Sequence, residues 1–178
     1  ASGVVFWLLA TLSLNIYEQG TRLPDIALRN AAGETVKLSD YQGGPLVINL
    51  WATWCPPCRR EMPVLENAQQ QRPDLTFLFV NQAESMQSVA TFLETQGLSL
   101  NNVLFDRGGR LGQAVGSMAL PTTLFYSPDG RLLGSHLGEL SNASLARALE
   151  NFDTAPSSPN PAAATVNSAR KLPCPASA

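Results

Sequence analysis

The chain has 178 residues, of which 44% are hydrophobic and 15% charged, and its formal net charge is −2. This composition fits a globular protein with one sizeable core and some spare length. The near-neutral charge gives no indication of a nucleic acid or of any other strongly charged partner, and we expect a monomer.

The first residues of the chain are apolar and uncharged. Residues 1–17 carry no charged side chain, and the stretch GVVFWLLATLSL from Gly3 to Leu14 is mostly apolar. A full bilayer span needs about 20 such residues. We interpret residues 1–19 as the remnant of a membrane anchor or an uncleaved signal, since Trp7 and Tyr17 suit a membrane interface. The alternative is an N-terminal element that packs on the domain.

Residues 20–152 are expected to form the folded domain, because short apolar runs alternate there with helical patterns. The run LVINLW over 46–51 is nearly continuous, as expected for a strand buried on both faces. Gly97 ends a helical pattern, and the segment SPDG is a typical turn between two strands. In chain order, the patterns predict a hairpin of strands 26–28 and 35–38, a strand over 46–51, a helix over 57–71, a strand over 75–80, a helix over 85–96, a short helix over 110–115, a hairpin of strands 122–126 and 132–137, and a last helix over 142–152.

The order of these elements predicts an α/β protein. Alternating strands and helices imply a parallel centre with helices on its faces, and the closing hairpin adds antiparallel strands. This is the thioredoxin fold, a mixed central sheet flanked by helices, with an extra N-terminal β-hairpin. The remaining residues 153–178 are rich in Pro, Ala and Ser, and we expect them to be disordered.

The chain contains three cysteines, Cys55, Cys58 and Cys174, and the first two form a C-x-x-C pair. A structural zinc site needs four Cys or His ligands, but the sole histidine is His136 and there is no second pair. Attachment of a c-type haem needs a His directly after the second Cys, where this chain has Arg59. Redox chemistry of the pair, without metal or cofactor, is therefore the leading interpretation. No partner for Cys174 can be named.

The position of the pair suggests its chemistry. Cys55 follows a buried strand and begins a helix, where free N–H groups and the helix dipole favour an anion. We therefore expect a lowered thiol pKa at Cys55, and Cys58 lies one helical turn away on the same face. Pro56 and Pro57 fit the first helical turn and remove N–H donors near the sulfur. The alternative is an inert disulfide or a pair of buried thiols.

A second candidate is Pro121, which opens the strand predicted over 122–126. A proline at the start of a strand is compatible with a cis peptide bond. The alternative is an ordinary trans proline, which the sequence alone favours because cis bonds are a minority even before proline.

The segment NLWATWCPPCRREMP over 49–63, together with LPTT over 120–123, resembles the TlpA/ResA/DsbE (CcmG) family of thioredoxin-like proteins. The lead-in over 23–40 also matches the opening hairpin of that family, and the resemblance covers about residues 20–150. It implies that Cys55 is the attacking thiol, that Cys58 is the resolving thiol, and that Pro121 is a cis proline facing the pair. The expected substrate contacts are Pro121, Leu120, Trp54, Pro56 and Pro57.

The resemblance also singles out two acidic residues. Glu61 follows the motif where such proteins often carry a residue that tunes the cysteines. If it lies beneath them, its charge should raise the thiol pKa values, and it could relay a proton. The alternative is a solvated first-turn glutamate offset by Arg59 and Arg60. Glu84 is at another position that is often acidic in the family, and we carry it as a second acid/base candidate.

The function that the resemblance implies is reduction of protein disulfides in the periplasm, by a protein tethered to the inner membrane. Apocytochrome c in cytochrome c maturation is one expected substrate, and a membrane thiol transporter of the DsbD or CcdA type is the expected electron donor. Two alternatives are a protein disulfide oxidase and a non-catalytic, redox-regulated binding or chaperone module. A third is a cytosolic thioredoxin, against which the uncharged N-terminus and the added hairpin argue.

Overall fold

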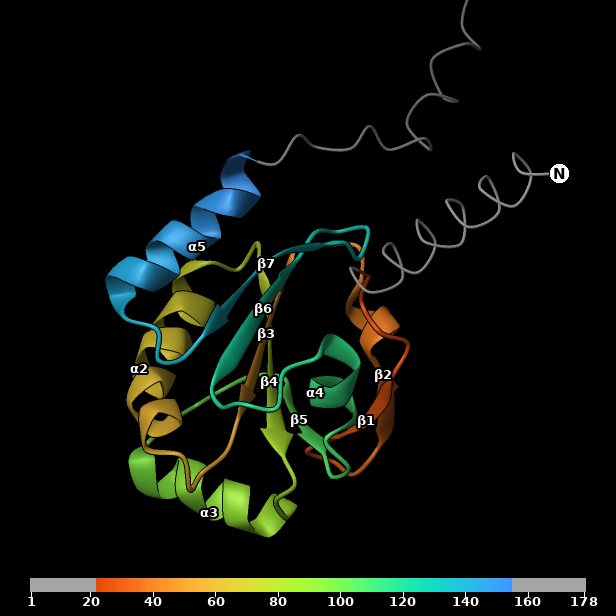
Figure 1. The fold of residues 1–178 in the computed structure, drawn as a ribbon. Coiled ribbons are helices and arrows are strands. Elements are labelled where there is room, and N and C mark those ends of the chain that lie inside the picture. Colours follow the sequence, from red (N-terminus) through yellow and green to blue (C-terminus); the bar gives the residue numbers. More distant parts are fainter. Residues whose placement is uncertain (1–21, 155–178) are drawn as a thin grey trace, which may run out of the picture.

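The computed structural model describes residues 22–154 (Figure 1). The anchor expected in residues 1–19, the tail after residue 154 and Cys174 lie outside the described residues. Within 22–154 no helix combines the length and apolar character that a membrane crossing requires.

The described residues form one mixed sheet of seven strands in the order β2-β1-β5-β4-β3-β6-β7. Strand β4 pairs parallel with β3 on one side and with β5 on the other. Strand β6 pairs antiparallel with β3, and β1 pairs antiparallel with β5. The strand bounds are Ala27–Asn30 for β1, Thr35–Lys37 for β2, Leu46–Trp51 for β3, Thr76–Gln82 for β4, Val103–Asp106 for β5, Thr122–Tyr126 for β6 and Leu132–Leu137 for β7. The parallel centre and the antiparallel closing hairpin are confirmed.

Helices cover both faces of this sheet (Figure 1). Their bounds are Pro56–Gln71 for α2, Met86–Gln96 for α3, Arg110–Val115 for α4 and Asn142–Thr154 for α5, with a 3-10 turn η1 over Leu38–Tyr41. One core cluster joins the sheet to α2, α3 and α5, and a second joins its other face to η1 and α4. The described part of the chain is therefore a three-layer α/β domain with the thioredoxin architecture.

The central strand β3 explains how both faces are filled. All six of its residues are buried. Val47 and Trp51 point into the cluster under α2, whereas Leu46, Ile48 and Leu50 point into the other cluster. Because successive side chains of a strand alternate between faces, an almost continuous apolar run was needed at this position.

The structure differs from the sequence predictions in one whole strand and at the ends of several elements. Strand β5, Val103–Asp106, was not predicted, because a run of three apolar residues between polar ones carries no alternation to distinguish it from a loop. It pairs with both β4 and β1, so that it joins the N-terminal hairpin to the main sheet. Leu38 begins the 3-10 turn η1 instead of ending a strand. Helix α5 also extends two residues beyond its predicted end.

Candidate active site

The two cysteines meet at the start of α2, where Cys55 is the residue that caps the helix. They form a disulfide with 5.3 Å between their Cα atoms. The backbone N–H of Cys58 donates to Cys55 Sγ at 3.3 Å, and Pro56 and Pro57 occupy the first two helical positions. Cys55 is 3% exposed and Cys58 is fully buried. Cys55, unlike Cys58, thus retains a small contact with solvent.

Glu61 lies buried on the same helix, one turn after Cys58, with no exposed surface. Its Oε1 accepts a hydrogen bond from Asn49 Nδ2 at 2.8 Å, and its Oε2 accepts one from the backbone N–H of Leu140 at 2.9 Å. Burial raises the pKa of Glu61 to about 7, against the lowering effect of these hydrogen bonds, and the carboxylate of Glu139 raises it further. Glu61 therefore can gain or release a proton near neutral pH.

The alternative of a solvated glutamate offset by two arginines is wrong. Arg60 instead forms an ion pair with Glu139 at 2.7 Å on the surface. The Arg59 guanidinium lies 5.6 Å from the centre of the Phe92 ring. Within residues 22–154 neither cation is bonded to Glu61, whose charge is instead stabilised by the hydrogen bonds from Asn49 and Leu140.

Asn49 is a site residue that the sequence analysis did not select. Its Nδ2 donates both to Glu61 and to Thr123 Oγ1 at 3.0 Å, so that it connects β3 with α2 and β6. Its Oδ1 is buried and has no hydrogen-bond partner in the described part of the chain. The available signal was a lone polar side chain in the otherwise apolar run of β3, since buried polar groups need a stated reason.

Glu84 lies just beyond β4 and holds the turn that precedes the cysteines. Its Oε2 accepts from the Thr53 backbone N–H at 2.8 Å and from Asn81 Nδ2 at 2.6 Å, and its Oε1 accepts from the Thr53 hydroxyl. Three donors thus engage the carboxylate. This geometry positions the chain before Cys55, whereas the acid/base role of Glu84 stays a prediction.

The peptide bond between Leu120 and Pro121 is cis, as the resemblance implied and against the trans form that the sequence alone favours. Pro121 is buried, and its carbonyl accepts from the Gly138 N–H at 2.9 Å. Thr122 Oγ1 donates to the Ala119 carbonyl at 2.7 Å, which closes the loop locally. The loop leads directly into β6, and through Thr123 into the Asn49 and Glu61 hydrogen bonds.

A pocket of about 330 Å³ adjoins the cysteine motif through Trp54. Trp54 is 68% exposed and Met118 is 69% exposed, which makes them two of the three exposed large apolar residues of the described chain. The full lining is Trp54, Gln82, Ala83, Arg107, Gly108, Gly109, Ser117, Met118 and Leu120. Trp51, in contrast, belongs to the core and packs against Phe92 with 5.8 Å between ring centres.

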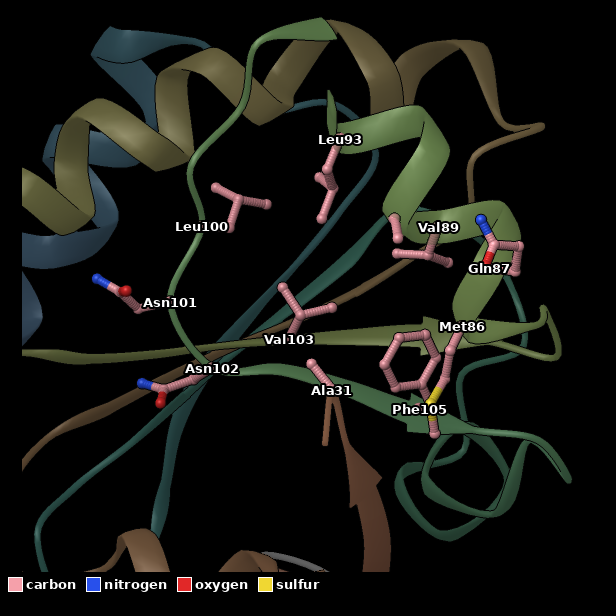
Figure 2. Close-up of a pocket in the computed structure, with 11 residues that line it drawn as sticks. Ala31, Met86, Gln87, Val89, Leu93, Leu100, Asn101, Asn102, Val103 and Phe105 are labelled. Atoms are coloured by element: carbon pink, nitrogen blue, oxygen red, sulfur yellow. The ribbon is translucent and has the colours of Figure 1, made fainter. Parts of the chain in front are cut away.

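A larger pocket of about 490 Å³ lies elsewhere, between α3, β5 and the turn after β1 (Figure 2). Met86, Val89, Leu93, Val103 and Phe105 form much of its apolar wall. Neither the cysteine motif nor the Leu120–Pro121 loop contributes to it, so it is not the reaction site. Among residues 22–154, no group of three or more His, Cys, Asp and Glu side chains could hold a metal.

Comparisons with known proteins extend across the described domain. The family model Redoxin matches residues 18–150. The thioredoxin-like protein YneN of Bacillus subtilis is 30% identical over 137 residues, which cover 75% of this chain and 79% of that protein. The thiol-disulfide oxidoreductase ResA of Geobacillus thermodenitrificans is 30% identical over 161 residues, which cover 84% and 92%.

Solved structures of thiol-disulfide proteins are also similar to this chain. A thiol:disulfide interchange protein of the thioredoxin family from Chlorobium tepidum superposes with a TM-score of 0.64 at 25% identity, covering 74% of this chain and 95% of the other. A secreted thiol-disulfide isomerase from Corynebacterium glutamicum gives a TM-score of 0.64 at 25% identity, covering 74% and 85%. The family match over residues 18–150 spans all seven strands of the described sheet and the cysteine-bearing helix α2.

Proposed function

The chain belongs to the Redoxin family, in its TlpA/ResA/DsbE-like thioredoxin group, and is a thiol–disulfide oxidoreductase; on this premise, we propose that it reduces protein disulfides in the periplasm or an equivalent compartment. The observation that carries the direction of electron flow is the Glu61 carboxylate, which is buried on α2 one turn after Cys58. An ionised carboxylate there disfavours thiolates, and Pro56 and Pro57 remove N–H donors that would stabilise them. A destabilised dithiolate favours the disulfide form, and such a pair gives up its electrons readily.

The reaction uses both cysteines in turn. The Cys55 thiolate attacks one sulfur of the substrate disulfide, which forms a mixed disulfide and releases the other substrate sulfur as a thiol after it takes a proton. Cys58 then loses its proton, attacks Cys55 Sγ and breaks the mixed disulfide. Two electrons pass from the Cys55–Cys58 dithiol to the substrate, which leaves as a dithiol, and the intramolecular disulfide reforms.

Glu61 and the cis-proline loop support these steps. A carboxyl group with a pKa of about 7 can accept the Cys58 proton when Cys58 attacks. Pro121, Leu120, Trp54, Pro56 and Pro57 would contact the substrate backbone and the side chains next to its disulfide. The pocket beside Trp54 and Leu120 lies where such side chains would be held.

The reduction potential separates a reductase from a protein disulfide oxidase. We expect a value nearer the roughly −270 mV of thioredoxin than the roughly −120 mV of DsbA. Equilibration of the chain with glutathione or dithiothreitol buffers, followed by tryptophan fluorescence or thiol alkylation, measures it. A potential near that of DsbA would assign the chain to oxidation.

Trapping of intermediates tests whether the chain is a catalyst at all. In Cys58→Ser the resolving thiol is absent, so substrate proteins should accumulate on Cys55 as adducts that a reductant releases. The matched variant Cys55→Ser should accumulate none. If neither variant trapped any protein in the native organism, a redox-regulated binding module would replace the catalytic assignment.

The relatives support a proposal for the cellular location and the partners of the chain. The Corynebacterium glutamicum neighbour is described as secreted, which supports an extracytoplasmic location here. We propose that a membrane thiol transporter of the DsbD or CcdA type re-reduces the pair, and that apocytochrome c is one substrate. Analysis of the proteins trapped on Cys58→Ser tests both assignments.

A further inference from the structure

The pocket beside the cysteine motif combines an apolar wall with one cation. Trp54, Met118 and Leu120 supply the wall. The segment Arg107, Gly108 and Gly109, between β5 and α4, also lines the pocket. Among the described residues that line the pocket, the Arg107 guanidinium is the sole charged group.

Arg107 differs from the arginines around it in its lack of a partner among residues 22–154. Arg110 Nη2 donates to the Ala27 carbonyl at 2.6 Å, and Arg29 Nη1 donates to the Gly33 carbonyl at 2.8 Å. Within the same described range the structure gives Arg107 no hydrogen bond and no ion pair. Its exposed side chain lines the active-site pocket and two adjoining hollows.

The nearby carboxylate of Glu84 does not pair with the Arg107 guanidinium. Glu84 lines one adjoining hollow together with Arg107. Its two oxygens already accept three hydrogen bonds from Thr53 and Asn81, and no ion pair with Arg107 forms. Within the described domain, Arg107 is thus a cation without a partner at a mostly apolar pocket that Trp54, the residue before Cys55, also lines.

We infer that Arg107 is a specificity-determining residue, which favours protein substrates carrying an acidic side chain close to the disulfide to be reduced. The inference rests on the proposed function and adds the substrate class. An apolar side chain of the substrate covers Trp54 and Met118, and a neighbouring carboxylate pairs with the guanidinium of Arg107. A basic side chain at the same position is disfavoured by repulsion, which is how like charges reject partners.

The test uses the full chain and three disulfide-bonded peptides that differ only at the residue after one cysteine, which is Glu, Gln or Lys. We expect kcat/KM for the Glu peptide to exceed that for the Gln peptide about threefold at low salt, as exposed ion pairs allow. The Lys peptide should be the poorest. The difference should lie in KM and should shrink as salt screens the pair.

Arg107→Gln should abolish the preference for Glu over Gln. The matched control is Arg147→Gln, since Arg147 is an exposed arginine on α5 and its loss changes the net charge equally. The control should retain the full preference. A preference that Arg107→Gln leaves intact, or that Arg147→Gln also removes, would overturn the inference.

Failure of the inference differs from failure of the proposed function. If the three peptides were reduced at equal rates by the unaltered chain, the reductase assignment would stand and the role of Arg107 would be refuted. If no peptide were reduced, although dithiothreitol kept Cys55 and Cys58 as thiols, both assignments would be refuted.

Discussion

Replacement of Glu61 by Gln should change how stability depends on pH in the disulfide form. Burial raises the pKa of Glu61 to about 7 from an ordinary value of 4.5. One pKa unit corresponds to about 1.4 kcal/mol, so the ionised form costs the folded state about 3 kcal/mol. Because the folded pKa is raised, about 3 kcal/mol of the unfolding free energy depends on Glu61 being protonated. This part of the stability is fully present below pH 4.5 and is lost as pH rises through about 7.

The amide introduced by Glu61→Gln is neutral at every pH, so this variant should not suffer the loss. Urea denaturation of both oxidised proteins between about pH 4 and pH 8.5 measures the effect, with Cys174→Ser in both to prevent intermolecular disulfides. The difference in unfolding free energy should shift by about 3 kcal/mol in favour of the Gln variant across this range. All other ionisable groups are common to both proteins and cancel in the difference.

Asn49→Ala provides an internal check on the same reasoning. It removes a hydrogen bond that lowers the pKa of Glu61, so the stability loss should level off above about pH 7 instead of near it, and the total loss should be larger. Parallel pH profiles for the unaltered chain and Glu61→Gln would refute the assignment of a buried, proton-binding carboxyl. A stability loss that levelled off at the same pH in Asn49→Ala as in the unaltered chain would refute the role of Asn49.

Two further predictions concern the backbone around the site. Glu84→Ala leaves three donors without their acceptor and should lower the free energy of unfolding by about 1–3 kcal/mol in urea titrations, whereas the exposed control Glu94→Ala should change it by less than about 0.5 kcal/mol. Gly112→Ala would place a Cβ 2.7 Å from the carbonyl oxygen of Ser117 and should cost about 1–3 kcal/mol by the same assay. Gly134→Ala meets nothing within 4 Å, so an equal loss there would contradict the steric argument.

The cysteine motif and its helix were predictable because their signals are local. A buried strand, a Cys-Pro-Pro-Cys run and a helical pattern are contiguous between positions 46 and 71, and the structure places β3 and α2 there. Helix α2 begins at Pro56, one residue before the predicted start. The cis form of the bond before Pro121 was implied by resemblance and not by the residues themselves, since no local pattern distinguishes it from a trans proline.

The supporting residues were not predictable for the opposite reason. Glu61 bonds Asn49 and Leu140, and Asn49 also bonds Thr123. Sheet pairing and helix packing bring these groups together, although the bonded residues are 12 to 79 positions apart in the sequence. Arg107 entered no prediction because strand β5, which delivers it to the pocket, was itself missed. Long-range contacts of this kind depend on the assembled fold, and a single sequence does not reveal them.

The two cysteines at the start of α2 lie in different electrostatic surroundings. The N–H of Cys58 and the helix N-terminus favour negative charge on Cys55. Glu61, one turn beyond Cys58, opposes a second negative charge at Cys58 while it is itself ionised. We therefore expect Cys55 to attack first and Cys58 to keep its proton until the mixed disulfide has formed. Since the same carboxyl has a pKa of about 7, the step that resolves the mixed disulfide should accelerate as pH rises through that value, because Glu61 must be ionised to take the proton.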